Sequence, residues 1–245
     1  MKIIAHRGAS GYAPENTMAA FEKALAMGAE AVEFDVQMTR DGQLIVIHDD
    51  YLDRTSNGHG LVIKTDHSVI KNLDAGSWYD LAYENEGVPL LKDVLLLMKD
   101  QVEVHLEIKK ISLEERPTEE AIYRLVKSLD MIDQVIFSSF DHRCLLKLSQ
   151  MHHVRIGLLT GASLLNPATY VKDSGINVVS YNPSAEYVGP ELVDAFHGDG
   201  RKVYAYTVND VALAQHFETM GVDGIFSNYP DILDGKPGKW TESAI

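Results

Sequence analysis

The chain has 245 residues, a formal net charge of -14 at pH 7 and a single cysteine, Cys144. This length suits one α/β barrel or two smaller domains. The acidity disfavours nucleic-acid backbones and anionic membrane surfaces as partners, so a phosphate site would need local cations. One cysteine excludes an internal disulfide, and no apolar stretch is long enough for a signal-peptide core or a membrane span. We therefore expect a cytoplasmic protein without a nucleic-acid partner or stable membrane association.

Short β-type runs alternate with helical patterns along most of the chain. In order, they are a strand at 2–6, a helix at 17–28, strands at 31–36 and 44–48, a helix at 90–100, a strand at 102–109, a helix at 119–131, a strand at 134–139, a helix at 142–152, strands at 154–160 and 177–182, a helix at 190–200, a strand at 202–208, a helix at 210–221 and a strand at 223–228. Such alternation predicts a parallel sheet. Eight strands besides 44–48 predict an α/β fold, a closed (β/α)8 TIM barrel.

The run LIVIH at 44–48 needs a separate account, because it follows AVEFDVQM after little more than TRDG. A parallel neighbour would require a crossover of about a dozen residues. Asp41-Gly42 is a tight-turn signal, so this run is expected to return as an antiparallel hairpin arm. With the turn centred near Asp41, we expect His48 opposite Glu33 or Asp35, on the face that carries both carboxylates.

The segment from about 50 to 89 lacks clear periodicity and carries several glycines beside Trp78 and Tyr79. A segment this long inside a barrel is typical of an inserted subdomain or lid rather than a plain loop. We therefore expect residues 1–245 to form a single barrel domain, with a small insertion subdomain after the second strand.

Three carboxylates occupy strand positions that alternate with apolar residues. They are Glu33 and Asp35 in AVEFDV, and Glu107 in VHLEIKK. Period two places the apolar set under the outer helices and the polar set inside the barrel, near its wet mouth, although a solvated sheet face is the alternative. Gathered acids repel one another unless they hold a cation. We predict one divalent cation, and all-oxygen ligation favours Mg²⁺ or Ca²⁺ over zinc.

His6 and Arg7 directly follow the first strand. An isolated histidine is more often a satisfied core residue, but beside Arg7 and the acids His6 is a candidate for proton transfer near neutral pH. The planar fork of donors on Arg7 suits a pair of phosphate oxygens, with a surface salt bridge as the alternative. Lys109 shares the face of Glu107 and either pairs with that carboxylate or helps to neutralise a phosphate.

Several polar and aromatic residues stand at predicted strand ends, where they could line the barrel mouth: Ser139, Phe140, Tyr206, Ser227 and Asn228. Tyr206 best suits an apolar or stacking contact, and barrel packing explains it equally well. Asn16 follows Pro14 at a predicted helix start, so it either caps that helix or faces the mouth.

Taken in order, several blocks of the sequence resemble the glycerophosphodiester phosphodiesterases. The blocks are HRGAS and PENT, then EFDV, TRDGQLIVIHD, LEIK, TVN and GVDGIFSNYP, between about residues 3 and 231. The chain has no Gly-rich phosphate loop and no G-x-S-x-G elbow. The resemblance implies a barrel of the phospholipase C-like phosphodiesterase type with an insertion. It also implies hydrolysis of small-molecule glycerophosphodiesters to sn-glycerol 3-phosphate and an alcohol, with magnesium or calcium.

Matched residue by residue, His6 and His48 fall on the acid–base pair of that family, and we favour His6 as the base. The other matched positions are Glu33, Asp35 and Glu107 for the metal, and Arg7 and Lys109 for the phosphate. Tyr206 stands where many relatives carry tryptophan, a difference that concerns packing on the glycerol or alcohol side.

Two other functions stay open at the level of the sequence. The same barrel could act on a lysophospholipid, as a lysophospholipase D does, or on a phosphoinositide-like ester, through an apolar entry built by the insertion. A non-catalytic metal- or phosphate-binding barrel would instead have lost an acid, base or ligand that this chain retains. A homodimer is expected only because two-fold dimers are common.

Overall fold

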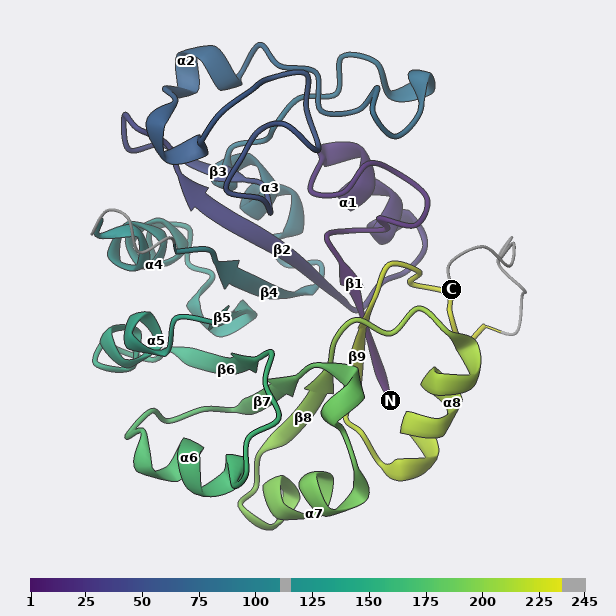
Figure 1. Ribbon diagram of the computed structural model, residues 1–245. Coiled ribbons are helices and arrows are strands. Elements are labelled where there is room, and N and C mark those ends of the chain that lie inside the picture. The colour runs from purple at the N-terminus through teal and green to yellow at the C-terminus, as the bar shows by residue number, and fades with distance from the viewer. Residues whose placement is uncertain (111–115, 235–245) are drawn as a thin grey trace.

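Eight parallel strands close into a barrel in the computed structural model, which describes residues 1–110 and 116–234 (Figure 1). The closure is made by β1, which pairs with β2 on one side and β9 on the other. The strands are β1 Lys2–His6, β2 Ala31–Met38, β4 Glu103–Ile108, β5 Val135–Ser139, β6 Arg155–Thr160, β7 Ser180–Pro183, β8 Lys202–Ala205 and β9 Gly224–Ser227. The predicted (β/α)8 TIM barrel is confirmed.

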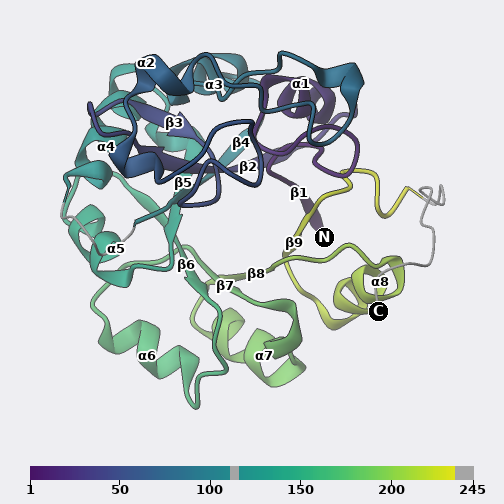
Figure 2. The ribbon, with the colours of Figure 1, turned by 45° about the horizontal axis from the view of Figure 1, so that its top comes forward.

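Helices cover the outside of the barrel, as the two views in Figures 1 and 2 show. They are α1 Met18–Ala26, α3 Leu91–Met98, α4 Thr118–Ser128, α5 His142–Ser149, α6 Pro167–Asp173, α7 Pro190–Gly198 and α8 Val211–Met220, with a 3₁₀ turn at η3 Ile132–Gln134 and another at η4 Ala185–Tyr187. Buried apolar side chains join the two layers, as where Phe21 of α1 meets Phe34 of β2 edge to face. The pattern-based prediction misses α6, which has only seven residues. None of the helices in the described ranges has the length and apolar character of a membrane span.

The predicted hairpin is present, but its predicted register is wrong. β3 (Leu44–Val46) pairs antiparallel with the end of β2, and Val36 lies opposite Val46. The connecting loop covers residues 40–42, and Gly42 supplies a left-handed φ of 82°. Pairing around Asp41 joins residues of equal parity, so His48 falls level with Phe34 rather than with either carboxylate. β3 ends before His48, whose position is set by the bend that follows.

The chain between β3 and α3 forms only short elements. They are η1 Val62–Lys64, α2 His67–Ile70 and η2 Leu81–Tyr83. This segment lies beside α1 and α3 (Figures 1 and 2). It packs a separate apolar cluster around Ile47, Leu52 and Ile70. Its status as an inserted subdomain of one barrel domain stays a prediction.

The barrel interior is polar at its base as well as at its mouth. Glu103 begins β4 and accepts hydrogen bonds from Lys2 (2.8 Å) and Arg155 (2.9 Å). His105 is fully buried, with its Nε2 3.2 Å from Glu103 Oε1 and its ring against Tyr204. The expectation that inward polar residues are tolerated only near the wet mouth is therefore wrong for His105, because an ion-pair cluster satisfies this end of the strand.

Candidate active site

The three predicted carboxylates converge at the carboxyl end of the barrel strands. Asp35 lies level with Glu107 in the pairing of β2 with β4, and Glu33 faces the same interior two residues earlier. One ligand atom from each of the three lies within 4.8 Å of the others, and all three residues are buried. The cluster expected from period two is therefore formed in the folded chain.

A donor from the protein holds one oxygen of each carboxylate. The backbone N–H of Arg7 donates to Glu33 Oε2 (2.9 Å), and Asn16 Nδ2 donates to Asp35 Oδ2 (2.8 Å). Lys109 Nζ donates to Glu107 Oε1 (2.7 Å). These bonds fix the three side chains before any ligand binds.

The charges in this cluster are not balanced. Burial and the neighbouring acids Asp35 and Glu107 raise the pKa of Glu33 well above its ordinary value. Burial and then Asp35 raise the pKa of Glu107 to about 7. Burial also acts to raise the pKa of Asp35, but Arg7 and Lys109 outweigh it and hold that pKa below its usual range. A divalent cation would relieve this repulsion, so the donor set and its charge fit a hard metal ion.

His6 ends β1 and stands level with Glu33 across the sheet. Its Nδ1 is 2.8 Å from Asn228 Oδ1, an oxygen that can only accept, so Nδ1 carries the hydrogen. Its Nε2 lies 4.0 Å from Glu33 Oε2 and lines the cavity. Burial and the nearby charge of Arg7 lower the pKa of His6 to about 4. The imidazole is therefore neutral near pH 7, with an unprotonated Nε2 in the mouth.

His48 reaches the same cavity from the bend after β3. Gln37 of β2 lies on the predicted polar face, and its Nε2 is 3.2, 3.0 and 2.7 Å from the carbonyl oxygens of Ile47, His48 and Asp49. The chain curls around this amide, which places the imidazole beside Glu33 and Glu107 in the cavity wall. His48 Nδ1 lies 2.6 Å from Asp49 Oδ1.

Arg7 lies deep in the mouth rather than in a surface salt bridge. Its Nη1 donates to Glu15 (2.7 Å), and its Nε is 3.3 Å from Asp35 Oδ2. Its backbone has a left-handed φ of 56°, which directs the N–H toward Glu33. The next residue, Gly8, also has positive φ, and a Cβ there would lie 2.7 Å from the backbone of Ala20. Only glycine allows this turn to pack against α1.

Asn16 faces the mouth and leaves the capping of α1 to its neighbour. Thr17 Oγ1 accepts the hydrogen bond from the Ala20 N–H, as a helix N-cap does. The amide oxygen of Asn16 also accepts from the backbone N–H of Asp35 (3.3 Å). Asn16 therefore forms hydrogen bonds with both the side chain and the backbone of Asp35.

A cavity of ≈ 190 Å³ joins the two histidines, and its wall divides into a polar half and an apolar half. The apolar half includes Phe140 and Tyr206, whose rings meet edge to face at 5.7 Å. The Tyr206 hydroxyl donates to the Thr160 carbonyl (2.7 Å), so Tyr206 presents its ring rather than its hydroxyl. The complete lining is His6, Arg7, Glu33, His48, Glu107, Ser138, Phe140, Leu159, Tyr206, Thr207 and Phe226.

Lys109 lies behind this wall rather than in it. Its Nζ binds Glu107, lies 3.5 Å from Asp35 Oδ1, and stands 5.9 Å from the centre of the Phe140 ring. Of the two alternatives for Lys109, the pair with the Glu107 carboxylate is present, and the phosphate contact stays a prediction.

Sequence reasoning misses three charged residues that surround the site. Glu15, Asp49 and Arg54 form ion pairs at its outer edge. Glu15 is noticed only as part of a helix start, and the other two lie in or beside the segment without periodicity. Asp49 adjoins His48, and this adjacency is the single signal that could have marked it.

Known proteins resemble this chain over nearly its whole length. A family model described as the glycerophosphoryl diester phosphodiesterase family matches residues 6–232. Two relatives called glycerophosphodiester phosphodiesterase, from Bacillus altitudinis and Caldanaerobacter subterraneus, are each 37% identical over 94% of this chain and 95% of their own length.

Solved structures agree with these sequence relatives. An Oleispira antarctica phosphodiesterase in complex with the product sn-glycerol-3-phosphate has a TM-score of 0.88 and 30% identity, covering 96% of this chain and 95% of that one. A glycerophosphodiester phosphodiesterase from Agrobacterium tumefaciens has a TM-score of 0.80 and 30% identity, covering 96% of this chain and all of that one.

Proposed function

This chain belongs to the glycerophosphoryl diester phosphodiesterase family, and on that premise we propose that it hydrolyses glycerophosphodiesters to sn-glycerol 3-phosphate and a free alcohol. The observation that carries the proposal is the buried triad of Glu33, Asp35 and Glu107, two members of which, Glu33 and Glu107, line one cavity with two imidazoles. Such a site offers a place for a cation, a proton acceptor and a proton donor around one phosphodiester.

The three carboxylates would hold one divalent cation. When bound, such an ion neutralises the charge that develops on the phosphoryl oxygens. We favour Mg²⁺ over Ca²⁺, because a donor already holds one oxygen of each carboxylate. Ligation through single oxygens suits an octahedral ion that keeps several waters, whereas Ca²⁺ takes roughly 6–8 oxygens, often in bidentate pairs.

The phosphate would lie against Arg7, whose planar guanidinium lines the cavity. Lys109 would contribute positive charge from behind the wall. Both side chains are held in place by carboxylates, Arg7 by Glu15 and Lys109 by Glu107, so they are ordered before substrate arrives. Preordered charges stabilise a transition state more than mobile ones do.

The two histidines would divide proton transfer between them. His6 is neutral near pH 7, and its unprotonated Nε2 can take the proton of the nucleophile, either water or the neighbouring glycerol hydroxyl. His48 has the carboxylate of Asp49 within 2.6 Å of Nδ1, a partner that orients the ring. Its Nε2 would then give a proton to the leaving alkoxide.

The apolar half of the wall, with Phe140 and Tyr206, would contact the carbon skeleton of the glycerol or the alcohol. A lysophospholipid would need that wall to receive an acyl chain. Phe140 is 46% exposed, so an apolar side chain is available at the rim, and this keeps a lysophospholipase D-like activity as the second candidate.

The test is an assay of glycerophosphocholine and lysophosphatidylcholine hydrolysis with Mg²⁺, with Ca²⁺ and with EDTA. We expect release of sn-glycerol 3-phosphate from glycerophosphocholine with Mg²⁺ and none with EDTA. His6→Ala and His48→Ala should each remove most of the turnover. Near-normal turnover in either variant would exclude that histidine from the mechanism, and full activity in EDTA would exclude the metal.

A further inference from the structure

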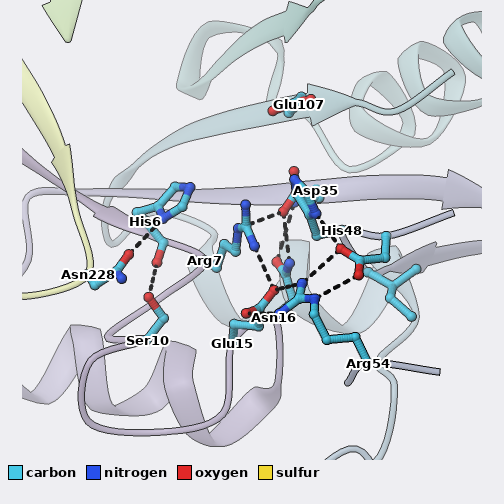
Figure 3. Close-up of polar contacts among 12 residues, drawn as sticks. His6, Arg7, Ser10, Glu15, Asn16, Asp35, His48, Arg54, Glu107 and Asn228 are labelled. Carbon is cyan, nitrogen blue, oxygen red and sulfur yellow. Dashed lines mark hydrogen bonds and ion pairs between the residues drawn. The ribbon is translucent and has the colours of Figure 1, made fainter. Parts of the chain in front are cut away.

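One arginine outside the cavity joins two loops of the site. Arg54 follows β3 by several residues, in the segment without periodicity. Its Nη1 and Nη2 donate to the two oxygens of Glu15 at 2.8 and 2.7 Å. Its Nε and Nη2 donate to the two oxygens of Asp49 at 2.7 and 2.8 Å. A single guanidinium therefore holds two carboxylates, each through a pair of hydrogen bonds (Figure 3).

Each of these carboxylates also holds a residue that lines the cavity. Asp49 Oδ1 lies 2.6 Å from Nδ1 of His48. Glu15 Oε1 accepts from Nη1 of Arg7 at 2.7 Å. Polar contacts thus run without a break from His48 through Asp49, Arg54 and Glu15 to Arg7.

This cluster is better fixed than an ordinary surface ion pair. The exposed fractions of the side chains are 13% for Glu15, 26% for Asp49 and 44% for Arg54. Isolated exposed pairs contribute little to stability, but networks with paired hydrogen bonds fix geometry. Arg54 acts to lower the pKa of Asp49 and, against burial, that of Glu15, so both acids are charged near pH 7.

We propose that Arg54 is a positioning residue that sets the His48 ring and the Arg7 guanidinium together. By fixing Asp49, it keeps a hydrogen on Nδ1 of His48, so that Nε2, turned toward the cavity, is the atom that carries and gives up the second proton. By fixing Glu15, it holds Arg7 over the phosphate position. The inference rests on the proposed function for the roles of His48 and Arg7, but the arrangement of the four partners stands on its own contacts.

The central test compares Arg54→Gln with Arg40→Gln. Arg40 also ties the β2–β3 loop to the segment after β3, through a two-bond ion pair with Asp66, but it touches no cavity residue. We expect Arg54→Gln to lower kcat/KM by tenfold or more, and Arg40→Gln to stay within twofold of the wild type. Equal activity in the two variants would overturn the proposal. Arg54→Lys keeps the charge but loses the fork, so it should recover only part of the loss.

A second measurement, NMR of the His48 ring, distinguishes a change in the positioning of His48 from unfolding of the protein. It does not depend on enzyme activity. The ¹⁵N shifts of the His48 ring distinguish a hydrogen on Nδ1 from one on Nε2. In Asp49→Asn, the N–H groups of Arg54 would engage the amide oxygen, leaving the amide NH₂ facing His48 and forcing the hydrogen to Nε2. We expect that change in Asp49→Asn, with a lowered kcat, and a mixture of tautomers in Arg54→Gln. Unchanged His48 shifts in both folded variants would refute the proposal.

Glu15→Gln tests the second part of the proposal, in which Arg54 acts on Arg7 through Glu15. It should raise KM through Arg7 and leave the His48 shifts as in the wild type. A wild-type protein that cleaves no glycerophosphodiester would remove the proposed function, while the ¹⁵N spectra would still decide the role of Arg54.

Discussion

Glu103 and Glu107 stand at opposite ends of the same barrel strand, and their surroundings shift their pKa values in opposite directions. At the base of β4, Glu103 is paired with His105, Lys2 and Arg155, which together hold its pKa well below its ordinary range. At the mouth, burial and the charge of Asp35 raise the pKa of Glu107 to about 7. The same residue type on one strand therefore has its pKa lowered at one end and raised at the other.

This contrast separates structural charge from functional charge. At the base of the barrel, the partly exposed acid Glu103 is paired with two cations, Lys2 and Arg155. The mouth has three acids against the two nearby cations, Arg7 and Lys109, so a further positive charge would stabilise it. Unbalanced buried charge at one end of a sheet is the mark of a binding site.

The largest expected effect comes from exchanging the two glutamates for glutamine. Glu107→Gln should lower kcat/KM for glycerophosphocholine by about 10²–10³-fold, because it would remove a charged ligand of the proposed metal ion from the transition state. Glu103→Gln should leave kcat/KM within a few-fold, since it lies at the far end of the barrel. Steady-state kinetics at saturating Mg²⁺ check both. Comparable losses in the two variants would mean that base and mouth do not differ in function.

The next effect is a pH dependence of stability in EDTA. The folded-state pKa of Glu107, about 7, lies above the ordinary value of 4.5. The stability that this group contributes is therefore fully present below pH 4.5 and is lost as pH rises through about 7. The difference between these two pKa values corresponds to about 3 kcal/mol of folding free energy. Urea unfolding at several pH values should give a steeper decline for the wild type than for Glu107→Gln, and parallel curves would refute this account.

Glu103→Gln should destabilise the protein, even though its activity survives. Lys2 and Arg155 would each lose a charged hydrogen-bond partner, a cost of about 1–2 kcal/mol since both can partly rehydrate. Glu120→Gln is the matched control, because the Glu120–Arg124 pair is exposed on α4 and contributes under about 0.5 kcal/mol. In thermal unfolding, Glu103→Gln should lower the melting temperature more than Glu120→Gln does. Equal melting temperatures would contradict this prediction.

The sequence predicts most of the barrel strands and the inward direction of the three carboxylates. The reason is that the alternation of apolar and polar residues can be read within a single strand. Glu33, Asp35 and Glu107 need no distant information: apolar neighbours on either side dictate which way they point. The pairing of Glu103 with Lys2 and Arg155 is different. It depends on three strands whose neighbours are set only when the barrel closes, so no local pattern in β4 indicates it.

The placement of His48 shows a second limit. The hairpin follows from the turn residues, but the path after Val46 follows from the amide of Gln37 and the carbonyls that it binds. The outer partners Asp49 and Arg54 lie beyond that bend. Their contacts depend on the tertiary path of a segment with no repeating pattern. Local sequence patterns therefore do not predict them.

The smallest effect tests how much a neutral hydrogen bond contributes to holding an acid of the mouth. Asp35 Oδ2 accepts from the neutral amide of Asn16, in addition to lying near the cations Arg7 and Lys109. Asn16→Gly removes this amide, and glycine accepts the left-handed φ of 59° at this position without strain. We expect Mg²⁺ affinity to fall by about tenfold, because a ligand that has lost its orienting partner binds the ion less tightly. Titration calorimetry checks this, with the exposed Asn72→Ala as control. If Asn16→Gly bound Mg²⁺ as tightly as Asn72→Ala, neutral hydrogen bonding would not be what prepares the mouth for its cation.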